Sequence, residues 1–153
     1  RLRTPAADVV EVNDEVRAIW QDMVDTMDAM PGVGLGAQQI GVMLRLAVVD
    51  TSEARNKRIF LANPEVIDAS AIMNVHEEAS PCLSGVSAKI SRPRGVRVRY
   101  MDETGAVVER DFVGLDATSV QHQIDHLAGK MYFDRLSKMK RDMLLKRARK
   151  VNG

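Results

Sequence analysis

Gln121-His122-Gln123-Ile124-Asp125-His126 is the stretch around which this chain is organised. Two histidines four residues apart on a helix project from the same face, so both imidazoles can bind one divalent metal. Gln123 follows the first histidine and would overlook water bound there. Glutamate at that position could take a proton from the water, whereas glutamine has nearly the same shape and cannot act as a base at neutral pH. The segment predicts a metal site whose proton acceptor is missing.

A third ligand would strengthen this interpretation, because a His-x-x-x-His pair also arises by chance on packed helices. Cys82 is the only cysteine and can supply that ligand, although free cysteines are most often buried hydrophobes. Two imidazoles and one thiolate would leave a fourth position for water, as in a catalytic metal site. Asp125 either orients a ligand ring or is a plain surface carboxylate. His76 has no partner at ligand spacing and is expected to be a surface or hairpin residue.

A glycine-rich stretch, residues 32–41, lies far upstream of the histidines. It contains neither Gly-x-Gly-x-x-Gly nor Gly-Lys-Ser/Thr, and it precedes a probable strand, whereas nucleotide loops follow one. Phosphate binding is therefore excluded. The glycines would instead let the backbone approach a ligand closely and leave Gln39 to point its amide toward a substrate carbonyl.

The order of the predicted elements indicates an α+β fold with antiparallel strands around a central helix, because a parallel sheet would need alternating strands and helices. Three helices are expected. The first begins at an Asn13 cap and ends at Pro31-Gly32, and the second begins at an Asp116 cap and ends near Gly129. The third covers residues 135–150. The expected strands are 44–49, then 58–62 and 65–73 hinged at Asn63-Pro64, and a hairpin of 96–101 with 107–113.

Each expected helix has an apolar face. The first carries a Met-rich stripe whose simplest role is core packing. The second would pack through Val120, Ile124 and Leu127, and the third through Leu136, Met139, Met143 and Leu144.

Length and composition fit one globular domain over residues 1–153, with 45% hydrophobic content. Residues 1–134 hold 14 basic and 20 acidic side chains, whereas residues 135–150 hold 8 basic and one acidic. We find no apolar run long enough for a membrane span and no export signal, so a cytoplasmic protein without membrane contact is expected. An organelle is the alternative if a targeting segment precedes Arg1.

Three segments together resemble the peptide deformylase family, which removes the formyl group from the N-terminal methionine of new polypeptides. The family signatures are a Gly-x-Gly-Leu-Ala-Ala-x-Gln-x-Gly loop, a Glu-Gly-Cys-Leu-Ser turn and a Gln-His-Glu-x-Asp-His-Leu-x-Gly helix. This chain matches them at residues 32–41, at Cys82-Leu83-Ser84 and at residues 121–129. Further similar residues at Asn63-Pro64-Glu65 and Arg92-Pro93 extend the resemblance over nearly the whole chain.

The resemblance implies a single divalent metal held by Cys82, His122 and His126. Ferrous iron is the expected native metal, with zinc or nickel as alternatives. Gln39 and the backbone N–H of Leu83 would receive the formyl oxygen as it becomes an oxyanion. The remaining implied contacts are Gly34 and Leu35 along the substrate backbone, an apolar pocket for the methionine side chain, and Gln123 at the position of the family's catalytic glutamate.

Several positions depart from the family pattern. Ser80-Pro81 replaces the Glu-Gly before the cysteine, Gly85-Val86-Ser87 replaces Val-Pro-Gly, and Thr118 stands where arginine is typical. With Gln123, these departures leave three hypotheses open: an impaired deformylase acting on formyl-methionyl peptides, a non-catalytic module that binds formylated N-termini, and a hydrolase of another formamide or small amide.

The basic segment 135–150 has two interpretations. It is either a solvated helix face that keeps the protein soluble or a surface that docks electrostatically near ribosomal RNA, which would suit an enzyme of nascent chains. No specific DNA binding is expected.

Overall fold

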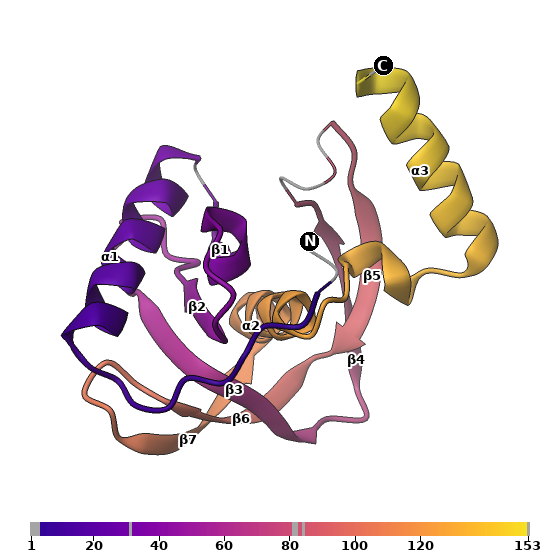
Figure 1. Cartoon of the computed structure of the whole chain (residues 1–153). Coiled ribbons are helices and arrows are strands. Elements are labelled where there is room, and N and C mark those ends of the chain that lie inside the picture. The colour runs from indigo at the N-terminus through magenta and orange to yellow at the C-terminus, as the bar shows by residue number, and fades with distance from the viewer. Residues whose placement is uncertain (1–3, 31, 81–82, 84, 153) are drawn as a thin grey trace.

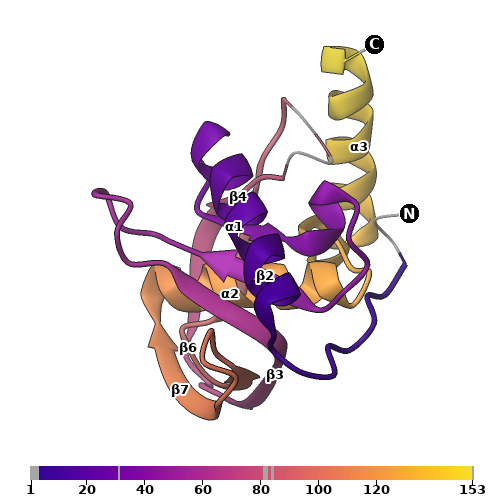
Figure 2. The same ribbon diagram turned by 60° about the vertical axis from the view of Figure 1, so that its left-hand side comes forward.

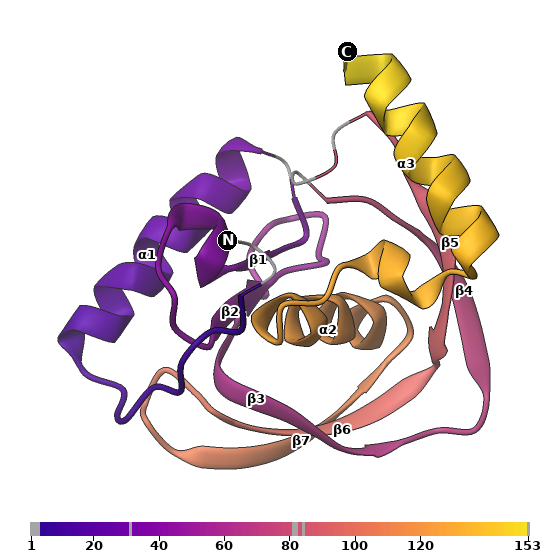
Figure 3. The ribbon, with the colours of Figure 1, turned by 45° about the vertical axis from the view of Figure 1, so that its right-hand side comes forward.

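The fold is an antiparallel sheet wrapped around one helix. The structure is a computed structural model that describes residues 4–30, 32–80, 83 and 85–152. Within these residues the strands of the larger sheet run in the order β1 (Gly34–Gly36), β2 (Leu46–Val49), β3 (Ile59–Ala69), β6 (Gly95–Met101) and β7 (Val107–Val113). A smaller sheet pairs β4 (Met73–Glu78) with β5 (Ala88–Pro93). Helix α2 (Gly114–Leu127) lies inside the curve that the strands make (Figures 1 and 3). The predicted α+β class is confirmed.

Helix α1 (Asp14–Ala29) confirms the expected N-terminal helix. The side chain of Asn13 accepts a hydrogen bond from the Val16 N–H at 3.0 Å, which satisfies one of the free N–H groups of the first turn. The helix ends just before Pro31-Gly32, and the predicted Met-rich stripe packs against β1 and β2. The buried residues of this face are Val16, Trp20, Met23, Val24 and Met27.

Strand β3 corrects the prediction of two strands hinged at Asn63-Pro64, because it runs through that dipeptide without a break. Asn63 adopts a φ of 52°, and the pairing of β3 with β6 shifts register between Ala62 and Glu65. Pro64 lacks an N–H group, so it is tolerated at such a bulge. The Asn63 side chain accepts from the Val9 N–H at 2.7 Å and donates to the Val9 carbonyl at 2.8 Å, which fixes the unusual conformation.

The hairpin of β4 with β5 is absent from the sequence-based prediction. β3 ends at Ala69, and Met73, expected as the end of a strand, is instead the first residue of β4. Asn74, His76 and Glu78 point inward on β4, whereas Met73 and Val75 are exposed. This reverses the usual pattern of apolar residues inside and polar residues outside. His76 is thus a hairpin residue, but it is half-buried and not a surface residue.

The hairpin of β6 with β7 forms as predicted, with Val98 paired to Arg110. Helix α2 follows directly and begins three residues earlier than expected. Its N-cap is Val113, and Asp116 lies in the first turn, where its carboxylate accepts a hydrogen bond from the Thr51 hydroxyl. The helix ends before Gly129, which has a φ of 80°, a conformation that glycine adopts without strain.

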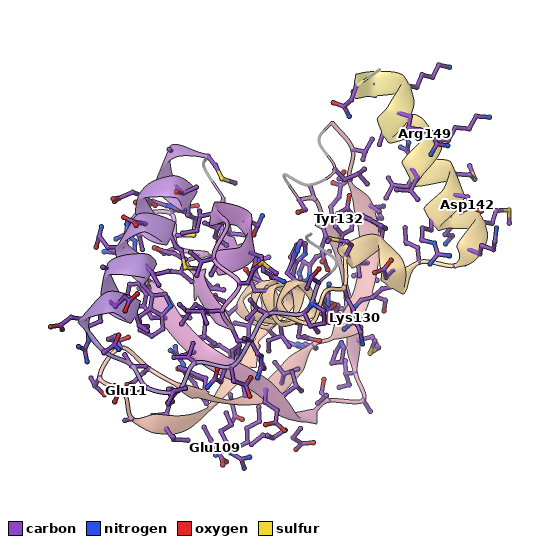
Figure 4. The ribbon with its side chains drawn as sticks, viewed as in Figure 1. Glu11, Glu109, Lys130, Tyr132, Asp142 and Arg149 are labelled. Atoms are coloured by element: carbon purple, nitrogen blue, oxygen red, sulfur yellow. The ribbon has the colours of Figure 1, made fainter. Side chains whose placement is uncertain are left out.

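The C-terminal segment consists of a short 3-10 turn, η3 (Tyr132–Arg135), and helix α3 (Lys138–Asn152). The expected packing face is partly wrong: Met139 and Met143 are 71% and 61% exposed, whereas Leu144 and Ala148 are buried. The helix lies at the edge of the fold on the side away from α1 (Figures 1 and 2), where Leu144 packs in a cluster with Ile90 of β5 and Phe133 of η3. Asp142 and Arg149 project outward from it (Figure 4). Among the described residues, no helix is both long and apolar enough for a membrane span.

Candidate metal centre

The two histidines of the opening motif lie one turn apart on α2, in its buried part. The centroids of the His122 and His126 rings are 4.9 Å apart. Both residues are buried, because strands enclose α2 on several sides. Such a helix cannot leave its polar side chains in water, so each needs a partner from a neighbouring element.

Those partners come from β4 and the residues after it, in a regular arrangement that we call the polar ladder. Every second residue of the strand meets every fourth residue of the helix. Two residues of a strand span about 6.6 Å and four residues of a helix about 6.0 Å, so the two spacings stay in step over three contacts. The contacts are His76 Nδ1 to Thr118 Oγ1 at 2.9 Å, Glu78 Oε1 to His122 Nδ1 at 2.7 Å, and Ser80 Oγ to His126 Nε2 at 3.4 Å.

The middle contact fixes the chemistry of His122. An ionised carboxylate only accepts hydrogen bonds, so the Nδ1 of His122 carries the proton that Glu78 accepts. The lone pair then resides on Nε2, which is the atom that a metal would bind. Glu78 therefore sets both the tautomer and the ring orientation of His122.

A buried arginine supports Glu78 from behind. Arg92 is fully buried and donates to the two carboxylate oxygens of Glu78 at 2.6 and 2.9 Å. It also donates to Asp125 at 2.9 Å, and Asp125 accepts two hydrogen bonds from Arg135 at 2.7 and 3.1 Å. Positive and negative side chains thus alternate from Arg135 of η3 through Asp125, Arg92 and Glu78 to the imidazole of His122. The interpretation of Asp125 as a plain surface carboxylate is wrong.

The pKa values in this network keep the carboxylates ionised. Burial by itself would raise the pKa of Glu78, but hydrogen bonds from His122 and Arg92 and the charge of Arg92 outweigh it and lower that pKa. The pKa of Asp125 is lowered too, because Arg135 and Arg92 outweigh the effect of its burial. Burial and the neighbouring His122 lower the pKa of His126 to about 4, so its imidazole is neutral at physiological pH.

These side chains fit a divalent metal. Two buried imidazoles lie close together, and the Nδ1 of His126 is buried without a hydrogen-bond partner among the described residues. Within the same residues no group of three or more His, Cys, Asp or Glu side chains is arranged to hold a metal, so the described part of the centre supplies two ligands. The expected third ligand, Cys82, lies outside the described residues.

A cavity of about 380 Å³ opens beside His122. Its walls include Gln39, Gln123 and the backbone of Gly34, so three of the residues expected around a substrate meet at one place. The predicted apolar pocket is mixed in character. Apolar Met30, Val33 and Leu115 line it together with polar Thr118, Ser119 and Ser80.

The strand β1 positions both glutamines. Gln39 accepts a hydrogen bond from the Gly36 N–H at 2.9 Å through Oε1, which leaves its Nε2 group as a donor. A Cβ atom on Gly34 would lie 2.8 Å from Nε2 of Gln123, closer than real Cβ contacts. The missing side chain of Gly34 therefore makes the room that Gln123 occupies.

Leu35 and Leu83 are the other two residues expected around a substrate. The side chain of Leu35 is fully buried in the core beneath α1, so only its backbone can run along a ligand. The N–H of Leu83 donates to the Ser80 carbonyl at 3.0 Å. A role for that N–H toward an oxyanion stays a prediction.

Sequence analysis missed Glu78 and the contact of His76 with Thr118. The signal was present in the sequence, because His76, Glu78 and Ser80 alternate at the spacing of a strand just before Cys82. It was overlooked because polar residues at that spacing usually face solvent.

A helix that carries two buried histidines one turn apart, one of them beside a cavity, can hold one metal ion between its imidazoles. A sequence model of the family described as polypeptide deformylase matches residues 1–142. The chain is 42% identical to a peptide deformylase of Afipia carboxidovorans over 99% of its length and 90% of the relative's. A relative from Rhodopseudomonas palustris is 43% identical, with 99% and 89% of the two chains covered.

Solved structures agree with the sequence comparison. A crystal structure of a peptide deformylase from Legionella pneumophila has a TM-score of 0.90 and 35% identity, covering 99% of this chain and 89% of that one. The Ehrlichia chaffeensis enzyme in complex with actinonin gives a TM-score of 0.89 and 31% identity, with 97% and 90% covered. The chain belongs to the peptide deformylase family.

We predict that Glu78→Gln weakens metal binding by about 10- to 100-fold, because the imidazole loses the carboxylate that fixes its tautomer. The zinc affinity of each protein is measured by competition with a chelator. Glu77→Gln is the matched control, since Glu77 is adjacent and exposed and should leave zinc affinity unchanged. Equal zinc affinity in the parent and Glu78→Gln would contradict this role for Glu78.

We also predict that Arg92→Met lowers the free energy of unfolding by about 3–5 kcal/mol, because the buried Glu78 carboxylate and the largely buried Asp125 carboxylate lose a shared partner. Urea unfolding measures this directly. Arg97→Met is the control: Arg97 also faces two carboxylates, those of Glu109 and Asp111, but it is 43% exposed and its loss should matter much less. Similar losses in the two variants would show that burial of Arg92 is not what makes it important.

Proposed function

We propose that this chain binds polypeptides that carry an N-formyl-methionine and hydrolyses the formyl group slowly, with a divalent metal held by Cys82, His122 and His126. Membership in the deformylase family supports the reaction type. The observation that carries the proposal is the position of the Gln123 amide, which shares a cavity with His122 and Gln39.

His122 and His126 would hold the metal through their buried imidazoles, with Cys82 as the thiolate ligand. When bound, the metal would act as a Lewis acid toward the formyl carbonyl and make a water molecule more acidic. Ferrous iron is the proposed native metal, with zinc or nickel as substitutes. Glu78 accepts the hydrogen bond from Nδ1 of His122, so Nε2 of that ring points away from Glu78 and stays available to the metal.

Gln39 would stabilise the charge that develops on the formyl oxygen. Its Oε1 is held by the Gly36 N–H, so its Nε2 group is pre-oriented as a donor. Loss of one such donor typically costs about 3 kcal/mol of transition-state stabilisation. Leu83 would supply a second donor through its backbone N–H, which would exchange its hydrogen bond to the Ser80 carbonyl for one to the substrate. Gly34 and the backbone of Leu35 would lie along the substrate.

Gln123 limits the rate, because an amide cannot take a proton at neutral pH or deliver one to the leaving amine. Positioned general acids and bases contribute about 10²- to 10⁴-fold. Hydrolysis should therefore be slower than in a site with glutamate by about that factor, while the binding contacts are retained.

We predict that Gln123→Glu raises formate release from a formyl-methionyl peptide by about 10²- to 10⁴-fold, since a carboxylate can carry the proton. Formate is measured with protein of verified metal content. Gln123→Met is the control and should stay as slow as the parent. A Gln123→Glu protein that holds its metal and remains inert would contradict the proposed reaction.

The basic helix α3 is proposed as a docking surface for ribosomal RNA, because the segment 135–150 concentrates positive charge. We predict that ribosome association, measured by co-sedimentation, weakens steeply between about 50 and 200 mM salt. Changing Lys146 and Lys150 to glutamine should weaken it and reduce the salt dependence, whereas Lys57→Gln on the main body should not. Binding that is insensitive to salt and to the α3 changes would contradict this docking surface.

A further inference from the structure

The loop between β2 and β3, residues 50–58, contacts two opposite walls of the cavity from outside. One contact goes to the wall that begins at Gly32, between α1 and β1. The other goes to the start of α2, where the Thr51 hydroxyl donates to Asp116, the neighbour of the cavity residue Leu115. Among the described residues, those of this loop do not line the cavity themselves.

Arg55 makes the contact with the first wall. Its Nη2 group donates to the Gly32 carbonyl at 2.5 Å and to the Asp28 carboxylate at 3.2 Å. Its Nη1 group donates to the Asp50 carbonyl at 3.0 Å. One guanidinium group therefore joins three segments: the end of α1, the cavity wall and the residue that follows β2.

The backbone of Arg55 adopts a conformation that arginine rarely takes. Its φ is 57°, in the left-handed region, where the Cβ atom is crowded. Such a conformation costs stability and persists only where surrounding contacts hold it. The hydrogen bonds of the guanidinium group supply those contacts, so the conformation and the link to the cavity wall depend on each other.

The Gly32 carbonyl lies just beyond the regular pairing of β1. β1 pairs with β2 from Gly34 onward, and a hydrogen bond from the Asp50 N–H to the Val33 carbonyl at 2.8 Å extends the ladder by one residue. Arg55 holds the next carbonyl toward α1. The guanidinium group thus continues the anchoring of this wall past the point where the sheet ends.

The cavity opens to solvent between the two walls, at an end that we call the mouth. Val33 and Met30 on the first wall are 44% and 37% exposed, and Leu115 on the second wall is 48% exposed. Leu35 and Gly36, further along the first wall, are buried. A polypeptide whose first residue enters the cavity therefore leaves it through the mouth.

We propose that Arg55 is a positioning residue that fixes the mouth for the part of a polypeptide that follows its first residue. It acts through the Gly32 carbonyl, while Thr51 holds the opposite wall. A mouth that is already ordered avoids the cost of ordering it when a ligand binds. This role rests on the proposed function, which brings a formylated polypeptide into the cavity.

The first test examines the mouth without a ligand. Arg55→Asn removes the guanidinium group but suits the backbone, because asparagine adopts a positive φ more readily than most residues. Amide hydrogen exchange over residues 30–36 should be faster in this variant than in the parent by about 5-fold or more, since the wall loses a hydrogen bond that holds it. Unchanged exchange would overturn the proposal.

The second test compares two ligands of zinc-loaded protein by calorimetry: a formyl-methionyl tripeptide and formyl-methionine amide, which has no second residue. Arg55→Asn should weaken binding of the tripeptide by about 3- to 10-fold, because the mouth now has to be ordered on binding. Its affinity for formyl-methionine amide should not change. An equal loss for both ligands would overturn the proposal, because it would show a general structural effect.

Arg58→Asn is the matched control. Arg58 donates to the same Asp28 carboxylate, and its side chain is 29% exposed against 30% for Arg55. Its contacts in the described part of the chain do not include the Gly32 carbonyl. Arg58→Asn should leave the exchange over residues 30–36 and both affinities as in the parent. Equal effects in the two variants would overturn the proposal, because they would assign the effect to Asp28.

The outcomes separate this role from the proposed function. If the parent binds the formylated tripeptide, but Arg55→Asn changes neither exchange nor affinity, the role of Arg55 alone is wrong. If exchange rises in Arg55→Asn while no zinc-loaded form binds the formylated tripeptide, the proposed function is wrong, and the role of Arg55 toward a polypeptide falls with it.

Discussion

The structure depends on a match between two residue spacings. Every second residue from His76 to Ser80 contacts every fourth residue of α2 from Thr118 to His126. Strands enclose α2, so the polar face that carries His122 and His126 has to be satisfied from within the protein. The polar ladder does this while the apolar side, with Val120 and Leu127, packs against the larger sheet. The fold and the site therefore share a cause: the enclosure that buries the helix also brings Glu78 to His122.

The electrostatics of the centre follow from the same enclosure. Replacement of Glu-Gly by Ser80-Pro81 removes a carboxylate just before the motif cysteine, and Glu78, two residues earlier on the same side of the strand, contacts the imidazole. Arg92 balances that charge, and Asp125 with Arg135 connects it to η3. Where the family's glutamate would stand beside His122, Gln123 adds no charge.

Several features could be predicted from the sequence because local chemistry determines them: the Asn13 cap, the hairpin of β6 with β7 and the placement of both histidines on one helix face. The hairpin of β4 with β5 could not, because its buried positions are polar and Met73 and Val75 are exposed, the reverse of the pattern used to recognise strands. The path of β3 through Asn63 depends on contacts with Val9, 54 residues away. The ion pair of Asp125 with Arg92, 33 residues away, escaped prediction for the same reason.

The central claim is that β4 sets the tautomer of His122 before any metal binds. Nitrogen-15 NMR of the metal-free protein at neutral pH measures this directly, because protonated and unprotonated imidazole nitrogens have well-separated shifts. We expect one His122 species with its proton on Nδ1 and an unprotonated Nε2. A His122 ring protonated at Nε2, or one exchanging between both tautomers, would contradict the claim that Glu78 orients the metal ligand.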